Sequence, residues 1–256
     1  MSFRPLESLE GKTAVVTGVM GGIGFATAER LAAKGARIIG IVRRNLEEAQ
    51  ARLSALPCSS SQPHMVLLAD VTNKVQIQEA VLNIDRCDIL VQCTGSTKRI
   101  PHEKIEILTD AYFDEMTRDN LRSYFTVIRA FTPLLRKSRE SVIVNIGSIA
   151  GNAHTAGGGS NLAYCAAKAG LDSLTRNLSK ALAPNIRVVG VSPGILDTKF
   201  VTKGFDSYPN LEHVANITPL KRICTVEDVA ATVEALTTLI RYVTGIVINV
   251  DGGKTL

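Results

Sequence analysis

Hydrophobic positions along the chain follow two alternating patterns. Short, nearly continuous runs of valine, isoleucine and leucine predict buried strands at 13–18, 36–42, 65–70, 87–92, 141–147, 185–191 and 245–250. Longer segments between them repeat apolar residues every three or four positions and predict helices at 24–35, 45–56, 74–84, 111–137, 163–182 and 226–240. Strands that are apolar on both faces and separated by helices are typical of a parallel sheet with helices on either side.

These elements predict an α/β fold: a single Rossmann-type doubly wound domain with a mostly parallel seven-stranded sheet and helices on both faces. A chain of 256 residues could also form two small domains. However, no repeat, low-complexity stretch or interdomain linker interrupts the alternation, which favours one domain over 1–256. In such a fold, ligands bind outside the carboxyl ends of the strands.

The composition is globular, with 45% hydrophobic and 21% charged residues. The first residues lack the apolar core of a signal peptide, and no apolar run reaches the length of a membrane span. The five cysteines are odd in number and lack ligand-like spacing, so we expect reduced thiols in a cytoplasmic protein. The four histidines are scattered, which predicts no metal site.

The formal net charge of +5 indicates an anionic binding partner. No run of lysine and arginine is long enough for a nucleic-acid arm, and the chain has no tryptophan. We therefore expect neither a nucleic acid nor a membrane as partner. The simplest interpretation of the charge is a solvated basic surface. The more specific alternative is that the charge serves to bind an anionic cofactor or an anionic substrate carrier.

A glycine-rich turn joins the first predicted strand to the first helix. Thr17 and Gly18 end the strand, and Gly22, Ile23 and Gly24 open the helix. Glycines allow a sharp turn and let backbone N–H groups approach a pyrophosphate at the helix N-terminus. A plain tight turn between strand and helix is the alternative. The position between strand and helix favours dinucleotide binding.

The end of the second predicted strand bears on which dinucleotide would bind. An acidic residue about 20 positions beyond the glycines would bond the ribose 2′-hydroxyl of NAD. This chain instead has Arg43 and Arg44, and its next carboxylates, Glu47 and Glu48, belong to the following helix. Two guanidinium groups suit a 2′-phosphate, although they could also be a solvated pair. NADP(H) is therefore favoured over NAD(H).

Tyr164 and Lys168 stand four positions apart in the alanine-rich helical segment. Residues at this spacing lie on one face of a helix, so the phenol and the ammonium group point the same way. Spacing alone favours a simple interpretation, in which a core tyrosine lies beside a solvated lysine.

The chain as a whole resembles the short-chain dehydrogenase/reductase family, over essentially its full length. The resemblance is carried, in order, by Thr17 to Gly24, Asp70-Val71, Asn120, Ser148, Tyr164 with Lys168, Pro193-Gly194 with Thr198, and the closing VDGG at 250–253. Each motif alone is weak. Their order, each at the end of the element where the family has it, makes the match specific.

The resemblance implies a catalytic role for four residues. Tyr164 would be the general acid that protonates a carbonyl oxygen, and Lys168 would lower the phenol pKa and bind the nicotinamide ribose. Ser148 would hydrogen-bond the substrate oxygen. Asn120 would hold a water that links the lysine to solvent, and its simpler alternative is an amide that stabilises a kink.

Other positions are implied in cofactor binding. Asp70 and Val71 would meet the adenine and Gly95 the neighbouring ribose, while the nicotinamide carboxamide would be held by Pro193, Gly194, Ile195 and Thr198. Asp70 could instead be an ordinary acid at a helix N-terminus, and Pro193-Gly194 an ordinary turn. The segment around 195–218 would form a substrate lid, where Phe200, Phe205 and Leu211 hint at an apolar substrate portion.

Three features depart from the family pattern. After the fourth strand, Gln92-Cys93-Thr94 stands where the family usually has Asn-Asn-Ala. Gly21 stands where some NADP-preferring members have a basic residue. The segment from Ser148 to Tyr164 is two or three residues longer than usual, and its three glycines suggest a flexible rim to the pocket.

The resemblance favours an NADPH-dependent carbonyl reductase, with a 3-oxoacyl thioester as the leading substrate. An NAD(P)-dependent alcohol, sugar or polyol dehydrogenase is the alternative, and a non-catalytic nucleotide sensor is a weaker one. The substrate would be a small molecule or carrier-bound. A basic landing surface for an acidic carrier could comprise Arg136, Lys137, Arg139, Arg176 and Arg187, or these could be ordinary solvated residues. Family members commonly assemble as homotetramers.

Overall fold

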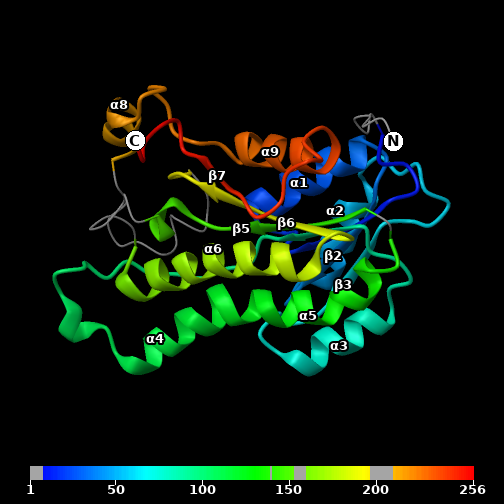
Figure 1. Ribbon diagram of the computed structural model, residues 1–256, viewed down its shortest axis with the longest axis horizontal. Helices are drawn as coiled ribbons and strands as arrows, with labels where there is room; N and C mark the ends of the chain where they lie inside the picture. The colour runs from blue at the N-terminus through cyan, green and yellow to red at the C-terminus, as the bar shows by residue number, and fades with distance from the viewer. Residues whose placement is uncertain (1–7, 139, 153–159, 197–209) are drawn as a thin grey trace.

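The computed structural model describes residues 8–138, 140–152, 160–196 and 210–256. Its seven strands form one sheet in the order β3-β2-β1-β4-β5-β6-β7, and every pair of neighbours is parallel (Figure 1). The strands are β1 Thr13–Thr17, β2 Arg37–Val42, β3 Met65–Leu68, β4 Ile89–Gln92, β5 Ser141–Ile146, β6 Ile186–Pro193 and β7 Val247–Val250. The predicted Rossmann-type sheet is confirmed.

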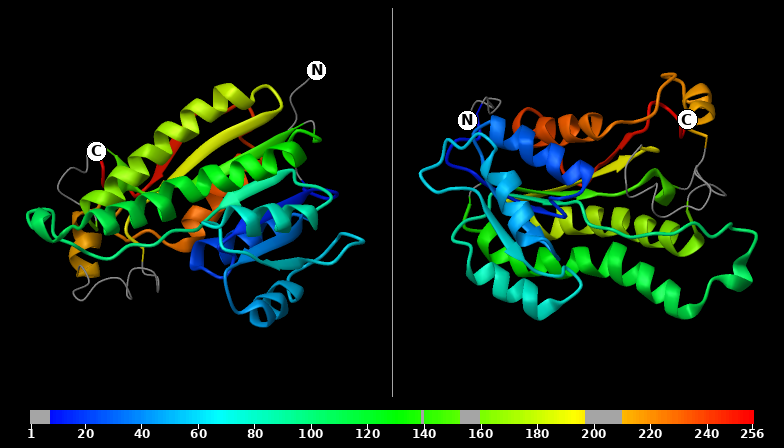
Figure 2. Two further views of the ribbon diagram at one scale, coloured as in Figure 1. Left: turned by 90° about the horizontal axis from the view of Figure 1, so that it is seen from below. Right: turned by 180° about the vertical axis from the view of Figure 1, so that it is seen from behind.

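Helices cover both faces of the sheet, as Figure 2 shows from two directions. One face carries α1 (Gly22–Ala33), α2 (Leu46–Ser54) and α9 (Val226–Thr238). The other carries α3 (Lys74–Leu82), α5 (Ser123–Leu135) and α6 (Leu162–Leu182), with α4 (Asp110–Thr117) packed against α6. The short helix α8 is Leu211–Ile217, and single 3₁₀ turns lie at Ile105–Ile107 and Ile149–Gly151.

The core is divided into two layers by the sheet. Consecutive residues of a strand point to opposite faces of the sheet. Val15 therefore packs on the face covered by α5, with Phe131, and Val16 packs on the other face, with Leu31 and Val229. Both valines are fully buried. This two-sided burial explains why the strands appear in the sequence as nearly continuous apolar runs.

The long helix predicted over 111–137 contains a break that the hydrophobic pattern does not show. A π-helical turn, Arg118–Arg122, separates α4 from α5. At this turn, the Asn120 amide donates to the carbonyl of Met116 at 3.1 Å, and the Ser123 hydroxyl, at the start of α5, donates to the carbonyl of Asp119 at 2.7 Å. Side-chain donors thus occupy carbonyls that regular helical bonds would use, and such turns are frequent at functional sites.

The topology reverses at β1, which pairs with β2 on one side and β4 on the other. The helix after β1, α1, lies on one face, and the helices after β4, α4 and α5, lie on the other. In sheets of this kind ligands bind at such a reversal, outside the carboxyl ends of the strands. The glycine turn after Thr17 and the segment after Gln92 meet there. In the part of the chain that the structure describes, no helix is both long and apolar enough to cross a membrane.

Candidate active site

The glycine turn is built so tightly that side chains are excluded from it. Gly18 has φ +66°, a left-handed conformation that favours glycine. A Cβ added to Gly24 would lie 2.4 Å from the carbonyl oxygen of Gly18, and one on Gly18 would lie 3.0 Å from that of Cys93. The turn therefore presses the start of α1 against the ends of β1 and β4.

The N-terminus of α1 offers free backbone donors at this turn. Gly21 is its N-cap, no side chain caps it, and its first turn has no acidic residue. The first N–H groups of a helix lack intrahelical partners and carry partial positive charge. The closely packed glycines and the uncapped helix together fit the pyrophosphate of a dinucleotide.

The side chains expected near the adenine end lie at the ends of β2 and β3. Arg43 and Arg44 are exposed, and the Arg43 guanidinium lies 3.9 Å from a carboxylate oxygen of Asp70. Burial opposes the charge on Asp70, but hydrogen bonds from Thr72 and the charge of Arg43 outweigh it, so the pKa of that carboxyl is lowered. Val71 is half-buried beside them. The region offers two cations and one ionised acid.

Tyr164 and Lys168 are both buried, which contradicts the simpler interpretation of a solvated lysine. Lys168 is 3% exposed, and its Nζ lies 5.7 Å from the centre of the Tyr164 ring. Burial lowers the pKa of Lys168 to about 8, although the charge of Asp172 opposes the shift. Burial raises the pKa of Tyr164 to about 12, against a hydrogen bond with Ser148 that lowers it. Neither shift is fully offset by partners within the protein.

Ser148 ends the segment that follows β5, in extended backbone. Its hydroxyl accepts from the N–H of Ala150 at 3.2 Å and hydrogen-bonds the Tyr164 phenol. The serine and tyrosine predicted from sequence are therefore adjacent. They come from elements 16 residues apart and meet at the carboxyl edge of the sheet.

Tyr124 is a member of this cluster that the sequence analysis did not identify. Its hydroxyl lies 2.6 Å from the carbonyl oxygen of Thr94 and 2.9 Å from that of Ile146, and it accepts from Lys168 Nζ at 3.4 Å. Lys168 also donates to Ile146 at 3.0 Å. The available signal was the spacing of Tyr124, four positions beyond Asn120 in the helix predicted over 111–137.

Asn120 is fully buried, and both the oxygen and the nitrogen of its side-chain amide bind the loop after β4. Its Oδ1 accepts from Ser96 N at 3.2 Å, and its Nδ2 donates to Ser96 O at 2.9 Å. A Cβ added to Gly95 would lie 2.8 Å from Asn120 Oδ1 and 3.9 Å from Lys168 Nζ. Gly95 therefore lies between the asparagine and the lysine, and a side chain there would clash.

The remaining predicted contacts lie at the end of β6. Pro193 is the last residue of the strand, and Gly194 donates its N–H to the carbonyl of Val250 at 2.9 Å. Ile195 follows and is half-buried. Thr198, Phe200 and Phe205 lie outside the described residues. Of the expected lid, 195–218, the structure describes only 195–196 and 210–218.

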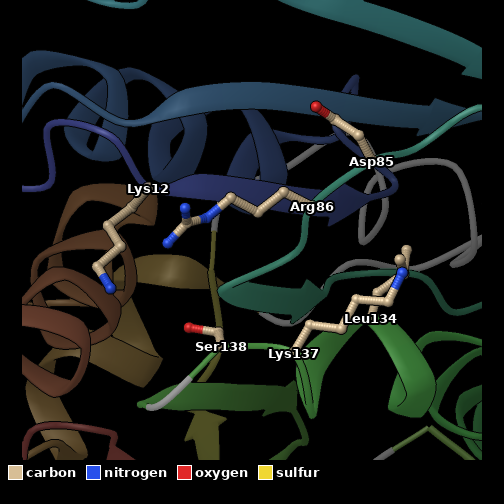
Figure 3. A pocket seen from close by; sticks show the side chains of 6 residues that line it. All are labelled: Lys12, Asp85, Arg86, Leu134, Lys137 and Ser138. Atoms are coloured by element: carbon tan, nitrogen blue, oxygen red, sulfur yellow. The ribbon is translucent and has the colours of Figure 1, made fainter.

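A separate cavity of about 440 Å³ lies at the amino edge of the sheet, at the far end from these groups (Figure 3). Lys12 and Arg86 line it just before β1 and β4, and Lys137 and Ser138 line it before β5. Asp88 beside it accepts from Arg86 at 2.6 and 2.8 Å, from Ser138 at 2.7 Å and from Thr13 N at 2.9 Å. The carboxylate is therefore satisfied by hydrogen bonds from within the protein.

The chain is similar to known proteins along nearly its whole length. The family described as Enoyl-(Acyl carrier protein) reductase matches residues 18–255. The chain is 32% identical to the 3-oxoacyl-(acyl-carrier-protein) reductase FabG of Thermotoga maritima, over 97% of this chain and 99% of the relative. A dehydrogenase/reductase from Sinorhizobium meliloti superposes with a TM-score of 0.86 at 30% identity, covering 97% of both chains. RhlG of Pseudomonas aeruginosa, in an active-site complex with NADP, gives 0.86 at 28% identity over 99% and 100%.

These matches define an NAD(P)-dependent oxidoreductase of Rossmann-type fold. The chain belongs to the short-chain dehydrogenase/reductase family, which confirms the resemblance seen in the sequence.

Proposed function

We propose that the protein is an NADPH-dependent carbonyl reductase that acts on 3-oxoacyl thioesters. The observation that carries the proposal is the cluster at the carboxyl edge, where Ser148 bonds Tyr164 and Lys168 lies one turn further on, behind the uncapped start of α1. With a dinucleotide held at the glycine turn, its reduced nicotinamide would supply the hydride for the carbonyl carbon. The protein must then supply a proton to the carbonyl oxygen.

Tyr164 is the proton donor in this proposal. Ser148 hydrogen-bonds the substrate oxygen and keeps it within reach of the phenol. After the phenol gives up its proton, the phenolate is stabilised by the Lys168 ammonium, which is buried with it and held in place by the Ile146 carbonyl. Stabilising the phenolate favours loss of the proton, so the lysine works against the burial that raises the pKa of the Tyr164 phenol to about 12.

Asn120 holds the loop that closes over Lys168. Its two bonds to Ser96 fix Gly95 beside the lysine. We assign it the family role of holding a water through which Lys168 exchanges protons with solvent, and so restores the Tyr164 proton after each turnover.

The preference for NADPH rests on Arg43 and Arg44, which are exposed at the end of β2 with no acid at the NAD position. The double variant Arg43→Ala/Arg44→Ala is expected to lower kcat/KM for NADPH by about ten- to a hundredfold and to leave that for NADH nearly unchanged. Arg136→Ala, which removes an exposed cation at the opposite edge, is the control. A wild-type preference for NADH would overturn the assignment.

The thioester substrate is supported by the similarity to FabG. The basic carrier-docking surface expected from sequence needs a correction, because Arg136, Lys137 and Arg187 do not lie at the site. Arg136 and Lys137 follow α5 and precede β5, which places them at the amino edge. Arg187 donates to the carbonyls of Leu236 and Val243 and is engaged in the fold. Arg139 lies outside the described residues. A carrier-bound substrate remains a proposal without this surface.

The test is the loss of reduced-cofactor absorbance with an acetoacetyl thioester, run with NADPH and NADH in parallel. Fast oxidation of NADPH alone supports the proposal. Turnover only in the oxidative direction, with sugars, polyols or other alcohols, would favour the alternative dehydrogenase. Cofactor binding without turnover of any carbonyl or alcohol would favour the nucleotide sensor.

A homotetramer in the cytoplasm completes the proposal. Phe113 and Phe125 on α4 and α5 are both exposed, as expected for a helical surface that pairs with another copy. Light scattering of the purified protein tests the assembly, and a monomer at assay concentration would contradict it.

A further inference from the structure

Asn161 stands three residues before Tyr164 and is the N-cap of α6. It is fully buried, and its Oδ1 accepts from the backbone N–H of Tyr164 at 2.8 Å. A capping residue needs only this acceptor to satisfy the start of a helix. Serine, threonine or aspartate would serve as well, so the cap alone does not account for a buried amide.

The amide nitrogen of Asn161 is also used, and it points to a different part of the site. It donates to Thr97 Oγ1 at 3.1 Å and to the carbonyl of Lys98 at 2.8 Å. Both partners lie in the loop that follows β4. Asn161 therefore joins two segments that are more than 60 residues apart in sequence.

Neighbouring bonds strengthen the same junction. The hydroxyls of Thr97 and Ser160 lie 2.6 Å apart, and Ile100 donates its N–H to the carbonyl of Ser160 at 2.8 Å. On its other side, the loop is held by Asn120 through both backbone groups of Ser96. A continuous series of bonds thus runs from Tyr164 through Asn161 and the loop to Asn120.

We infer that Asn161 is a positioning residue, whose carboxamide fixes the first turn of α6 to residues 96–100 and so sets the place of Tyr164 relative to Asn120 and Lys168. The inference rests on the proposed reductase function, because it assigns a catalytic consequence to this junction. Lys168 lies a turn deeper in α6 and has its own anchor at Ile146. Loss of the amide should therefore displace the tyrosine more than the lysine.

The test is Asn161→Ser, which keeps an acceptor for the helix but removes both amide donors. At saturating NADPH we expect kcat to fall by about ten- to a hundredfold with the dissociation constant for NADPH unchanged, since small displacements of reacting groups cost this much. Asn73→Ser is the matched control, because Asn73 caps α3 through Val75 N and Gln76 N. Asn73 is exposed and serine caps a helix about as well, so this change should leave both kcat and Tm close to wild type.

A second variant covers the case in which Asn161→Ser does not fold. Thr97→Val leaves the cap intact and removes one partner of the amide, and it should lower kcat by a smaller factor. In the double variant the two effects on kcat should not multiply, because both changes break the same junction. Equal kcat in wild type, Asn161→Ser and Thr97→Val would overturn the inference.

Hydrogen exchange separates this inference from the proposed function. Asn161→Ser should speed amide exchange in 96–100 as well as in the first turn of α6, whereas a simple cap would affect the first turn alone. If the wild-type protein turns over no carbonyl, the proposed function fails, and faster exchange in 96–100 still supports the junction. If exchange in Asn161→Ser were faster only within 161–165, the inferred junction with 96–100 would be contradicted.

Discussion

The pKa values of buried ionisable groups are decided by different effects at the two edges of the sheet. At the amino edge, burial opposes the charge on Asp88, but bonds from Arg86, Thr13 and Ser138 outweigh it and the pKa is lowered. At the carboxyl edge, burial prevails: the pKa of Lys168 is lowered to about 8, and that of Tyr164 is raised to about 12. At the amino edge the protein's own partners outweigh burial, and at the carboxyl edge burial outweighs the bonds that Lys168 and Tyr164 make.

This contrast indicates where a ligand contributes. A buried charge is stable when the fold itself supplies its hydrogen bonds and counter-charges. At the carboxyl edge the fold leaves backbone donors uncapped at α1 and holds Lys168 with neutral carbonyl and hydroxyl oxygens. Removing groups at the carboxyl edge should therefore cost activity, and removing groups at the amino edge should cost stability.

The largest effect is expected from Tyr164→Phe. The variant keeps the ring and loses only the proton donor, so turnover should fall by about 10²- to 10⁴-fold while NADPH binding and Tm stay close to wild type. Steady-state rates, cofactor fluorescence titration and thermal unfolding measure the three quantities. Retention of more than about a tenth of wild-type kcat would remove Tyr164 from its proposed role.

The opposite outcome is expected from Asp88→Ala at the amino edge. Thr13 N and Ser138 Oγ lose a buried acceptor, which should cost about 1–3 kcal/mol of unfolding free energy for each group left unsatisfied. The kcat of the folded fraction should not change. Urea denaturation and steady-state kinetics test this, and a specific loss of kcat at full folding would show that the two edges are not independent.

Titration of Lys168 should change kcat/KM and stability by less than the two substitutions above. As pH rises through about 8 the ammonium is lost, so kcat/KM of the free enzyme should fall. Its folded-state pKa lies below the unfolded value, so the unfolded chain binds more protons between the two values. Stability should therefore rise over the same window. Rates and Tm measured across this range check both signs, and a kcat/KM that stays constant would contradict a buried, functional ammonium.

The smallest expected effect is the change in stability on titration of His64, which precedes β3. Its Nδ1 accepts from Ile38 N at 3.0 Å and its Nε2 lies 3.0 Å from the carbonyl of Pro57, so the neutral ring satisfies both contacts. Burial lowers its pKa. Its contribution to stability should be complete above the unfolded pKa of about 6.5 and be lost as pH falls through the folded value. Wild type and His64→Gln should converge in Tm at acidic pH, while no change in their difference would exclude titration of His64.

The sheet, and the shared helix face of Tyr164 and Lys168, could be predicted because both depend on local patterns, whereas the other catalytic residues were assigned from the family resemblance and stay predictions. Valine-rich runs identify strands that are buried on two faces, and Tyr164 with Lys168 is set by helical spacing alone. Tyr124 and Asn161 escaped notice because their partners, Thr94, Thr97 and Lys98, lie in a loop with no periodicity. The misplaced carrier surface had an available signal, since residues between a helix and the next strand lie at the amino edge.

The most direct test of the account is amide hydrogen exchange with and without NADPH. The account predicts that the cofactor protects the carboxyl edge, at 17–24, 93–96 and 193–196, and leaves 12–13, 85–88 and 134–138 unchanged. Protection at the amino edge, with none around the glycine turn, would contradict it.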